Sequence, residues 1–346
     1  MSKKFDVVIG NPPYQDDLIG DNEAKSPPIY HLFMDAAFEV SVRAVLVTPA
    51  RFLSNAGQTP KSWNQKTLSD KHLSVAIFEP SSSTIFPGTA IDGGIVVTYR
   101  DATRVIGPIG SRSYLSDTAK SLVDAVTSRS SSSLASTITE HPCSWNEQVF
   151  VDHPELRERI PASSGLRMKT NTFERMREVC LKSDPKDGRE HVRILGLANR
   201  KREERWVRKE YVVAPEVVDK YKVIIASADG AAVRSGRVVG VPTVAMPGTG
   251  FTQTFMSIGK FDSEAEAEAC ATYVKTKFAR AMLGILKTTQ HNSAIKWKHV
   301  PLQDFTPGSD IDWSKPMPEI DQQLYEKYGL DPEEIAFIES NVKPMG

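Results

Sequence analysis

The chain has 346 residues, and its 43 basic and 43 acidic side chains leave a formal net charge of zero at pH 7. A basic surface spread over the whole protein is therefore excluded, and any surface for nucleic acid must be a local patch. No apolar run is long enough to cross a membrane, the N-terminus is polar, and the cysteines lack the spacing of metal ligands. These features predict a cytoplasmic protein of two domains, with reduced thiols and no metal site.

Expected strands and helices alternate in the N-terminal part of the chain. Residues 5–9 form a short apolar run that predicts a buried parallel strand. Apolar residues at helical spacing predict a helix over 29–40. Further strands are expected over residues 44–49, 73–79 and 91–99. Strands joined by helices of this length favour an α/β fold with a largely parallel sheet.

The first expected strand leads into Gly10 and then Asn11-Pro12-Pro13-Tyr14. Two prolines can neither continue a sheet ladder nor open a helix interior, so the chain must turn there in a stiff, extended form. The turn places an amide, a carbonyl with no neighbouring N–H and an aromatic ring at the carboxyl end of a strand. Open α/β sheets bind ligands at that end. These three groups suit a planar base that carries an exocyclic amine.

The Asn-Pro-Pro-Tyr run resembles motif IV of the gamma-class adenine-N6 DNA methyltransferases of restriction–modification systems. The resemblance implies that Asn11 and the Pro12 carbonyl accept hydrogen bonds from the adenine amine. It also implies that Tyr14 stacks on a base flipped out of the duplex. Residues 85–94 resemble motif VIII, in which Phe86 matches the aromatic on the other side of the base. The alternatives are a simple proline turn and, for Phe86, a core aromatic under a loop.

The family implies S-adenosylmethionine as cofactor, with Gly10 and Asn11 beside it. The Gly-rich turn and the acid that hold this cofactor should precede motif IV, and they are missing ahead of residue 5. Gly248 and Gly250 have the spacing of a weak Gly-X-Gly but lack a strand-then-helix frame. Strand 5–9 would then be an exposed apolar edge, which invites pairing. We therefore expect a second polypeptide to supply the cofactor-binding half; a truncated gene product and a local rearrangement are the alternatives.

Composition places a domain boundary near residue 128. Residues 1–127 are expected to form a partial Rossmann-like methyltransferase sheet, and the Ser-rich segment 128–138 a flexible linker. Residues 139–346 resemble the α+β target-recognition domain and helical tail of the combined restriction–modification methylases. Within them, Ser263 is expected to cap a helix that runs through Ile285.

Basic residues gather between Arg189 and Lys209, and clustered cations of this kind neutralise phosphates. With motif IV upstream, we expect Arg200, Lys201 and Arg205 to contact double-stranded DNA; a solvated charged loop is the alternative. A second set of DNA candidates follows the helix, although a polar surface loop explains it equally well: Lys287, Gln290, His291, Lys296 and Lys298.

Three functions remain open. The first is a site-specific DNA adenine-N6 methyltransferase component, incomplete alone, with Asn11, Pro12, Pro13, Tyr14 and Phe86 as its catalytic residues. The second is a non-catalytic DNA-binding or specificity subunit that retains a methyltransferase half-fold. The third is an Asn-Pro-Pro-Tyr enzyme that methylates protein glutamine or rRNA guanine, and the long C-terminal region argues against it.

Overall fold

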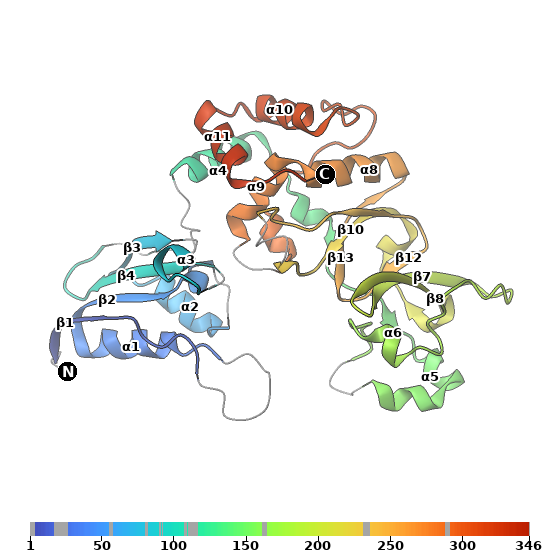
Figure 1. Ribbon diagram of the computed structural model, residues 1–346, viewed down its shortest axis with the longest axis horizontal. Coiled ribbons are helices and arrows are strands. Elements are labelled where there is room, and N and C mark those ends of the chain that lie inside the picture. The colour runs from blue at the N-terminus through green and yellow to red at the C-terminus, as the bar shows by residue number, and fades with distance from the viewer. Residues whose placement is uncertain are drawn as a thin grey trace. The chain divides into compact units, whose positions relative to one another are not determined.

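The computed structural model describes residues 4–16, 27–54, 58–79, 82–89, 91, 93–106, 109, 117–160, 165–230, 236–287 and 291–345. Contacts divide the chain into two compact units, unit 1 (Met1–Ser116) and unit 2 (Asp117–Gly346) (Figure 1). Within the described ranges, no helix is long and apolar enough to span a membrane.

Unit 1 is built on a four-stranded sheet of order β1-β2-β4-β3, with strands β1 (Phe5–Gly10), β2 (Ser41–Pro49), β3 (Leu73–Glu79) and β4 (Ile95–Asp101). β1 runs parallel to β2, whereas β4 is antiparallel to both β2 and β3. The expected largely parallel sheet is therefore wrong, although β1, β2 and β3 share one direction. A parallel return needs a crossover that travels back along the sheet, and helix α3 (Ser82–Ile85) is only one turn long.

Two helices cover one face of this sheet, α1 (Tyr30–Val40) and α2 (Lys61–Leu68), with the 3-10 helix η1 (Ala50–Ser54) between β2 and α2. Tyr30, Met34 and Ala37 lie at helical spacing on the buried side of α1. They join the core that contains Leu46 of β2 and Trp63 of α2. The helix and the strands expected in this region are thus confirmed, with ends that shift by a few residues.

Strand β1 lies at the edge of the sheet, where β2 is its one neighbour among the described strands. Its side chains Phe5, Val7 and Ile9 are 54%, 48% and 73% exposed. The expectation of a buried strand is wrong for this chain, because nothing in the described part of unit 1 covers that side of β1. The expected exposed apolar edge is confirmed.

The described part of unit 2 contains three small sheets. The first has the order β11-β10-β13-β5 and the second β12-β7-β8, while β6 pairs with β9. The strands are β5 (Ile138–Thr139), β6 (Ser144–Trp145), β7 (His191–Ala198), β8 (Lys201–Arg208), β9 (Val212–Val213), β10 (Tyr221–Ala226), β11 (Thr243–Ala245), β12 (Thr249–Phe251) and β13 (Phe255–Phe261). The helices are α4 (Asp117–Arg129), α5 (Gln148–Asp152), α6 (Thr172–Arg175), α8 (Glu264–Lys275), α9 (Lys277–Leu286), α10 (Met317–Tyr328) and α11 (Pro332–Asn341). Short 3-10 helices occur at η2 (Leu134–Thr137), η3 (Pro154–Arg159), η5 (Lys209–Tyr211), η6 (Glu216–Asp219) and η7 (Ala294–Trp297).

The Ser-rich segment belongs to unit 2 and does not act as a loose connection within it. Helix α4 packs against α10 and α11, and the Ser121 hydroxyl donates a 2.6 Å hydrogen bond to Glu334. Ser133 caps η2 by accepting from the Ala135 N–H, and Leu134 is fully buried. The contacts therefore place the boundary ahead of α4, whereas composition placed it after residue 127. Low-complexity composition did not reveal the buried leucine.

The single helix expected from Ser263 to Ile285 is two helices. Ser263 and Glu266 form the capping box of α8, which confirms the expected start. Thr276, with φ −59° and ψ 150°, ends α8, and its hydroxyl oxygen accepts from the Ala279 N–H at the start of α9. The carboxylate of Asp321 accepts from the next two N–H groups, of Lys277 and Phe278. A buried acid from α10 thus stabilises a helix start that periodicity alone had missed.

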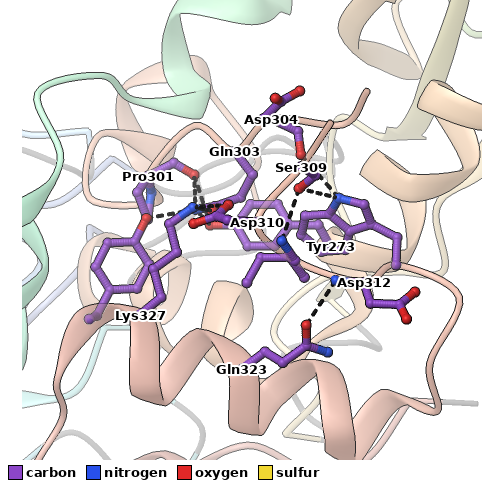
Figure 2. A network of polar contacts seen from close by, with 12 residues as sticks. Tyr273, Pro301, Gln303, Asp304, Ser309, Asp310, Asp312, Gln323 and Lys327 are labelled. Atoms are coloured by element: carbon purple, nitrogen blue, oxygen red, sulfur yellow. Dashed lines mark hydrogen bonds and ion pairs between the residues drawn. The ribbon is translucent and has the colours of Figure 1, made fainter. Parts of the chain in front are cut away.

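Gln303 is the centre of a polar network that joins α8, α10 and the segment between α9 and α10 (Figure 2). Its side-chain nitrogen donates to the Tyr328 hydroxyl at 2.8 Å, and its oxygen accepts from Lys327 at 3.0 Å. Lys327 also pairs with Asp310 at 2.7 Å, and the Tyr273 hydroxyl donates to the Pro301 carbonyl at 2.8 Å. The network joins helix α10 to the rest of unit 2.

Candidate active site and nucleic-acid surface

The Asn-Pro-Pro-Tyr run follows β1 directly and is tied to the chain ahead of α1. Asn11 and Pro13 are exposed, and Pro12 and Tyr14 are partly buried. The Tyr14 carbonyl accepts a hydrogen bond from the Ile29 N–H at 3.1 Å. The loop is therefore held from both sides, by the β1 strand and by the first residues of the helix region.

A pocket of about 120 Å³ lies at the carboxyl ends of β1 and β2. Its walls come from the end of β2, the start of α1, and residues after β1 and β2 or ahead of α1, α2 and β4: Tyr14, Gln15, Pro28, Tyr30, Pro49, Arg51, Gln58 and Ile91. An enclosed cavity that admits one benzene ring measures roughly 150 Å³, so this pocket is smaller than a closed site for one ring. Asn11, Pro12, Pro13 and Phe86 are not part of its walls.

The two tyrosines in the pocket wall stay protonated at neutral pH. Burial raises the pKa of Tyr14, and a hydrogen bond with the Asn11 side chain offsets part of that rise. Burial raises the pKa of Tyr30 to about 12, against smaller opposing effects of Thr59 and Arg51. Both phenols can thus offer a ring face or an O–H donor, but neither is set up as a base. The Tyr14 ring packs against the core of unit 1, which fixes its orientation.

Phe86 lies in the loop between α3 and β4 and is partly buried. Its N–H donates to the Ser82 carbonyl at 2.8 Å, and the Ser82 hydroxyl donates to the Thr89 carbonyl at 2.7 Å and accepts from the Ile91 N–H at 2.8 Å. Ser82 therefore closes this loop and brings Ile91 to the pocket wall. Sequence reasoning had missed Ser82 and Ile91 as residues of this site.

The Gly248–Gly250 pair leads into strands β12 and β13, not into a helix as a cofactor turn would. Gly250 lies in β12, and a Cβ there would fall 2.4 Å from the Cys143 sulfur, so this glycine serves close packing. No group of three His, Cys, Asp or Glu side chains that could hold a metal ion is found within the described ranges.

The first set of DNA candidates lies on the β7–β8 hairpin. Its turn residues Asn199 and Arg200 both have positive φ, 51° and 62°, which is the geometry of a tight hairpin turn. Arg200 and Lys201 are exposed there and remain candidates. Arg205 is 8% exposed, pairs with Glu203 at 2.5 Å and lies over the Phe173 ring. The expectation that Arg205 contacts DNA is therefore wrong, because the strand turns that side chain toward the core.

Most of the other basic side chains between Arg189 and Lys209 form ion pairs with carboxylates. The ion pairs are Arg189–Glu210 at 3.1 Å, Arg193–Glu204 at 3.5 Å, Arg208–Asp187 at 3.8 Å and Lys209–Glu190 at 3.0 Å. Phosphates would have to compete with these acids. The density of Arg and Lys in the sequence therefore overstates the positive charge that this surface offers.

The second set of candidates is divided. Lys287 is 7% exposed and donates to the Val238 carbonyl, and burial lowers its pKa to about 8 against an opposing effect of Asp229. The expectation that Lys287 contacts DNA is wrong, because its ammonium is buried and hydrogen-bonded to the protein's own backbone. His291 and Lys298 are exposed, and Lys296 is partly buried, which lowers its pKa. Gln290 lies outside the described residues.

Comparison with known proteins places a likeness in the N-terminal segment. No match is found among curated proteins. One similar solved structure is described as the type IIG restriction endonuclease BpuSI, with 9% identity and a TM-score of 0.34, over 92% of this chain and 48% of that one. This chain thus spans about half the length of that protein. Residues 1–86, which hold Asn11–Tyr14 and Phe86, match the family model of the Eco57I restriction-modification methylase.

Proposed function

We propose that this chain is the base-binding and DNA-recognising part of a restriction–modification DNA methyltransferase that acts on the N6 amine of adenine. One observation carries the proposal: the run Asn11–Tyr14 follows β1 directly, and Tyr14 lines a pocket at the carboxyl ends of β1 and β2. The likeness of residues 1–86 to the Eco57I restriction-modification methylases supports it. Unit 2, by this proposal, is the target-recognition domain.

Each residue of the run has a separate task. The Asn11 side-chain oxygen and the Pro12 carbonyl accept the two amine hydrogens, which turns the nitrogen lone pair out of conjugation with the ring. Pro13 has no N–H and keeps the bend stiff. Flipping the base costs a few kcal/mol, and stacking on Tyr14 returns roughly 1–3 kcal/mol. Phe86 closes on the second face of the base once it is bound.

S-adenosylmethionine is the methyl donor that this function requires, and the described residues do not offer it a complete site. The pocket of about 120 Å³ is smaller than the roughly 300–1,000 Å³ of ordinary ligand sites. The described residues of its walls include no carboxylate for ribose hydroxyls. We therefore propose that a second polypeptide brings the donor to the exposed edge of β1, beside Gly10 and Asn11.

Replacing Asn11 by Ala tests the assignment. Because the Asn11 amide is the proposed acceptor for the adenine amine and holds no phosphate, Asn11→Ala should abolish methyl transfer in a complex reconstituted with the cofactor-binding partner, while DNA affinity stays nearly unchanged. Radiolabelled methyl transfer and a binding titration measure the two effects. Asn341→Ala, which removes an amide from helix α11, is the matched control and should keep full activity. Wild-type turnover by Asn11→Ala would refute the proposal.

The absence of a complete cofactor site within the described ranges also favours a second candidate function, a non-catalytic specificity subunit with a methyltransferase half-fold. Calorimetric titration with S-adenosylmethionine separates the two candidates. Binding that occurs only with a partner polypeptide supports the methyltransferase. No binding in any combination of the chain with its neighbouring gene products supports the specificity subunit.

A further inference from the structure

We propose that unit 2 contacts the DNA backbone through a surface made of four short segments, 166–170, 226–228, 252–254 and 291–293, rather than through the Arg-rich hairpin. This inference rests on the proposed function and names the residues that would hold the duplex. We call these four segments the acid-free surface, because none of them contains Asp or Glu.

Backbone and hydroxyl hydrogen bonds bring the four segments together. The Gln253 N–H donates to the Met168 carbonyl at 2.9 Å, and the Thr254 hydroxyl donates to that of Thr170 at 3.1 Å. The Ser227 N–H donates to the Thr254 carbonyl at 2.8 Å, and the Asn292 N–H donates to the Ser227 carbonyl at 2.8 Å. Residues far apart in sequence thus form one continuous strip.

Arg167 and Lys169 give this strip its charge. Segment 166–170 lies beside residues 143–145 in extended form, with the Trp145 N–H bonded to Leu166 and the Met168 N–H to Cys143. Side chains alternate along an extended segment, and Met168 is fully buried, so Arg167 and Lys169 both lie on the opposite side. They line a small cleft together with Asn171 and Arg175, and the described residues of its walls include no carboxylate.

The remaining side chains of the strip suit phosphate as well. Thr170 and Gln253 are exposed, Ser227 and Thr254 are partly exposed, and His291 is exposed at the far end. Hydroxyls and amides of this kind bond phosphate oxygens and fix a protein on the duplex. Two acids border the strip. The Glu140 carboxylate accepts a hydrogen bond from the Ala294 N–H, and the Asp229 carboxylate is packed against Gly240, where a Cβ would fall 2.3 Å from the carboxylate oxygen. The hairpin, by contrast, carries an acid for most of its cations.

The test is the salt dependence of duplex binding by the full chain, followed by fluorescence anisotropy of a labelled DNA over a series of KCl concentrations. The slope of log K against log salt is negative, and each lost phosphate contact reduces its magnitude by about 0.9. Arg167→Ala/Lys169→Ala should therefore reduce the magnitude by about 1.8. Arg167→Glu/Lys169→Glu should weaken binding further. The matched control, Arg189→Ala/Lys209→Ala, removes two cations that face Glu210 and Glu190 and should leave the slope unchanged.

The outcomes separate the inference from the proposed function. Duplex binding by the wild type with the same slope in Arg167→Ala/Lys169→Ala overturns the acid-free surface and leaves the methyltransferase proposal standing. A slope of smaller magnitude in Arg189→Ala/Lys209→Ala alone would also overturn the acid-free surface and leave the methyltransferase proposal standing. Failure of the wild type to bind any duplex at low salt overturns both.

Discussion

Lys222 lies in β10 with no exposed surface, and its ammonium donates hydrogen bonds of 2.9–3.0 Å to the carbonyls of Val218, Lys220 and Met246. Burial lowers its pKa to about 8, although the nearby Cys143 opposes that shift. Like Arg205 and Lys287, this cation serves the protein's own backbone and core. At the scale of single residues, the partners that surround a cation decide its role.

The lowered pKa of Lys222 predicts a pH-dependent stability. Between pH 8 and the unfolded value of about 10.5, the unfolded chain binds more protons than the folded one, so this group makes stability rise with pH. Lys222→Met removes the effect. The free energy of unfolding of the wild type, measured relative to Lys222→Met, should therefore increase across this window, by at most roughly 3 kcal/mol. Urea unfolding at the two ends of the window measures it, and a constant difference would contradict the assignment.

At the scale of elements, the β1 edge governs association. An edge strand presents unpaired N–H and C=O groups, and apolar side chains next to them promote pairing with other chains. Ile9→Lys should therefore reduce self-association in light scattering without loss of folding stability, because Ile9 is 73% exposed. The control is Val105→Lys, a similarly exposed apolar residue outside any strand, 69% exposed. Equal light scattering by Ile9→Lys and the wild type would show that the β1 edge does not mediate self-association.

The β7–β8 hairpin illustrates a second element-level effect. Strand pairing places Glu204 opposite Leu195, within reach of Arg193, and the residues that flank the two strands bring Glu210 to Arg189, so this region neutralises much of its own charge. Arg200 occupies a turn position with φ 62°, a conformation that glycine adopts without strain. The paired arginines of the hairpin are therefore explained by structure alone, without a DNA contact.

At the scale of the whole molecule, the packing of helix α4 decides where the boundary between the two units lies. Leu122 of α4 is fully buried, and the helix packs on α10 and α11. Leu122→Ala should cost about 2–5 kcal/mol through the cavity it leaves. Amide hydrogen exchange should then quicken in α10 and α11 and stay unchanged in β2 and β4. Leu32→Ala, at a 58% exposed position in α1, is the control. Faster exchange in the sheet of unit 1 would return α4 to the first domain.

The sequence alone determined the local features of this protein: strand 73–79 with its observed ends, the Ser263 cap, and the stiff Asn-Pro-Pro-Tyr bend after a strand. Such features depend on residues a few positions apart, so periodicity, capping residues and prolines suffice to predict them. Ligand binding was expected at the carboxyl end of strand 5–9, because open α/β sheets bind ligands there, and Tyr14 lines a pocket at that end.

Only the tertiary structure decided which charges are free and how the strands pair. The insertion of β4 between β2 and β3, the burial of Arg205 and Lys287, and the meeting of Thr170, Thr254 and Asn292 all join residues that are distant in the sequence. Burial and ion pairing depend on what the fold brings opposite a side chain. That opposite partner is a property of long-range packing, which no local pattern encodes.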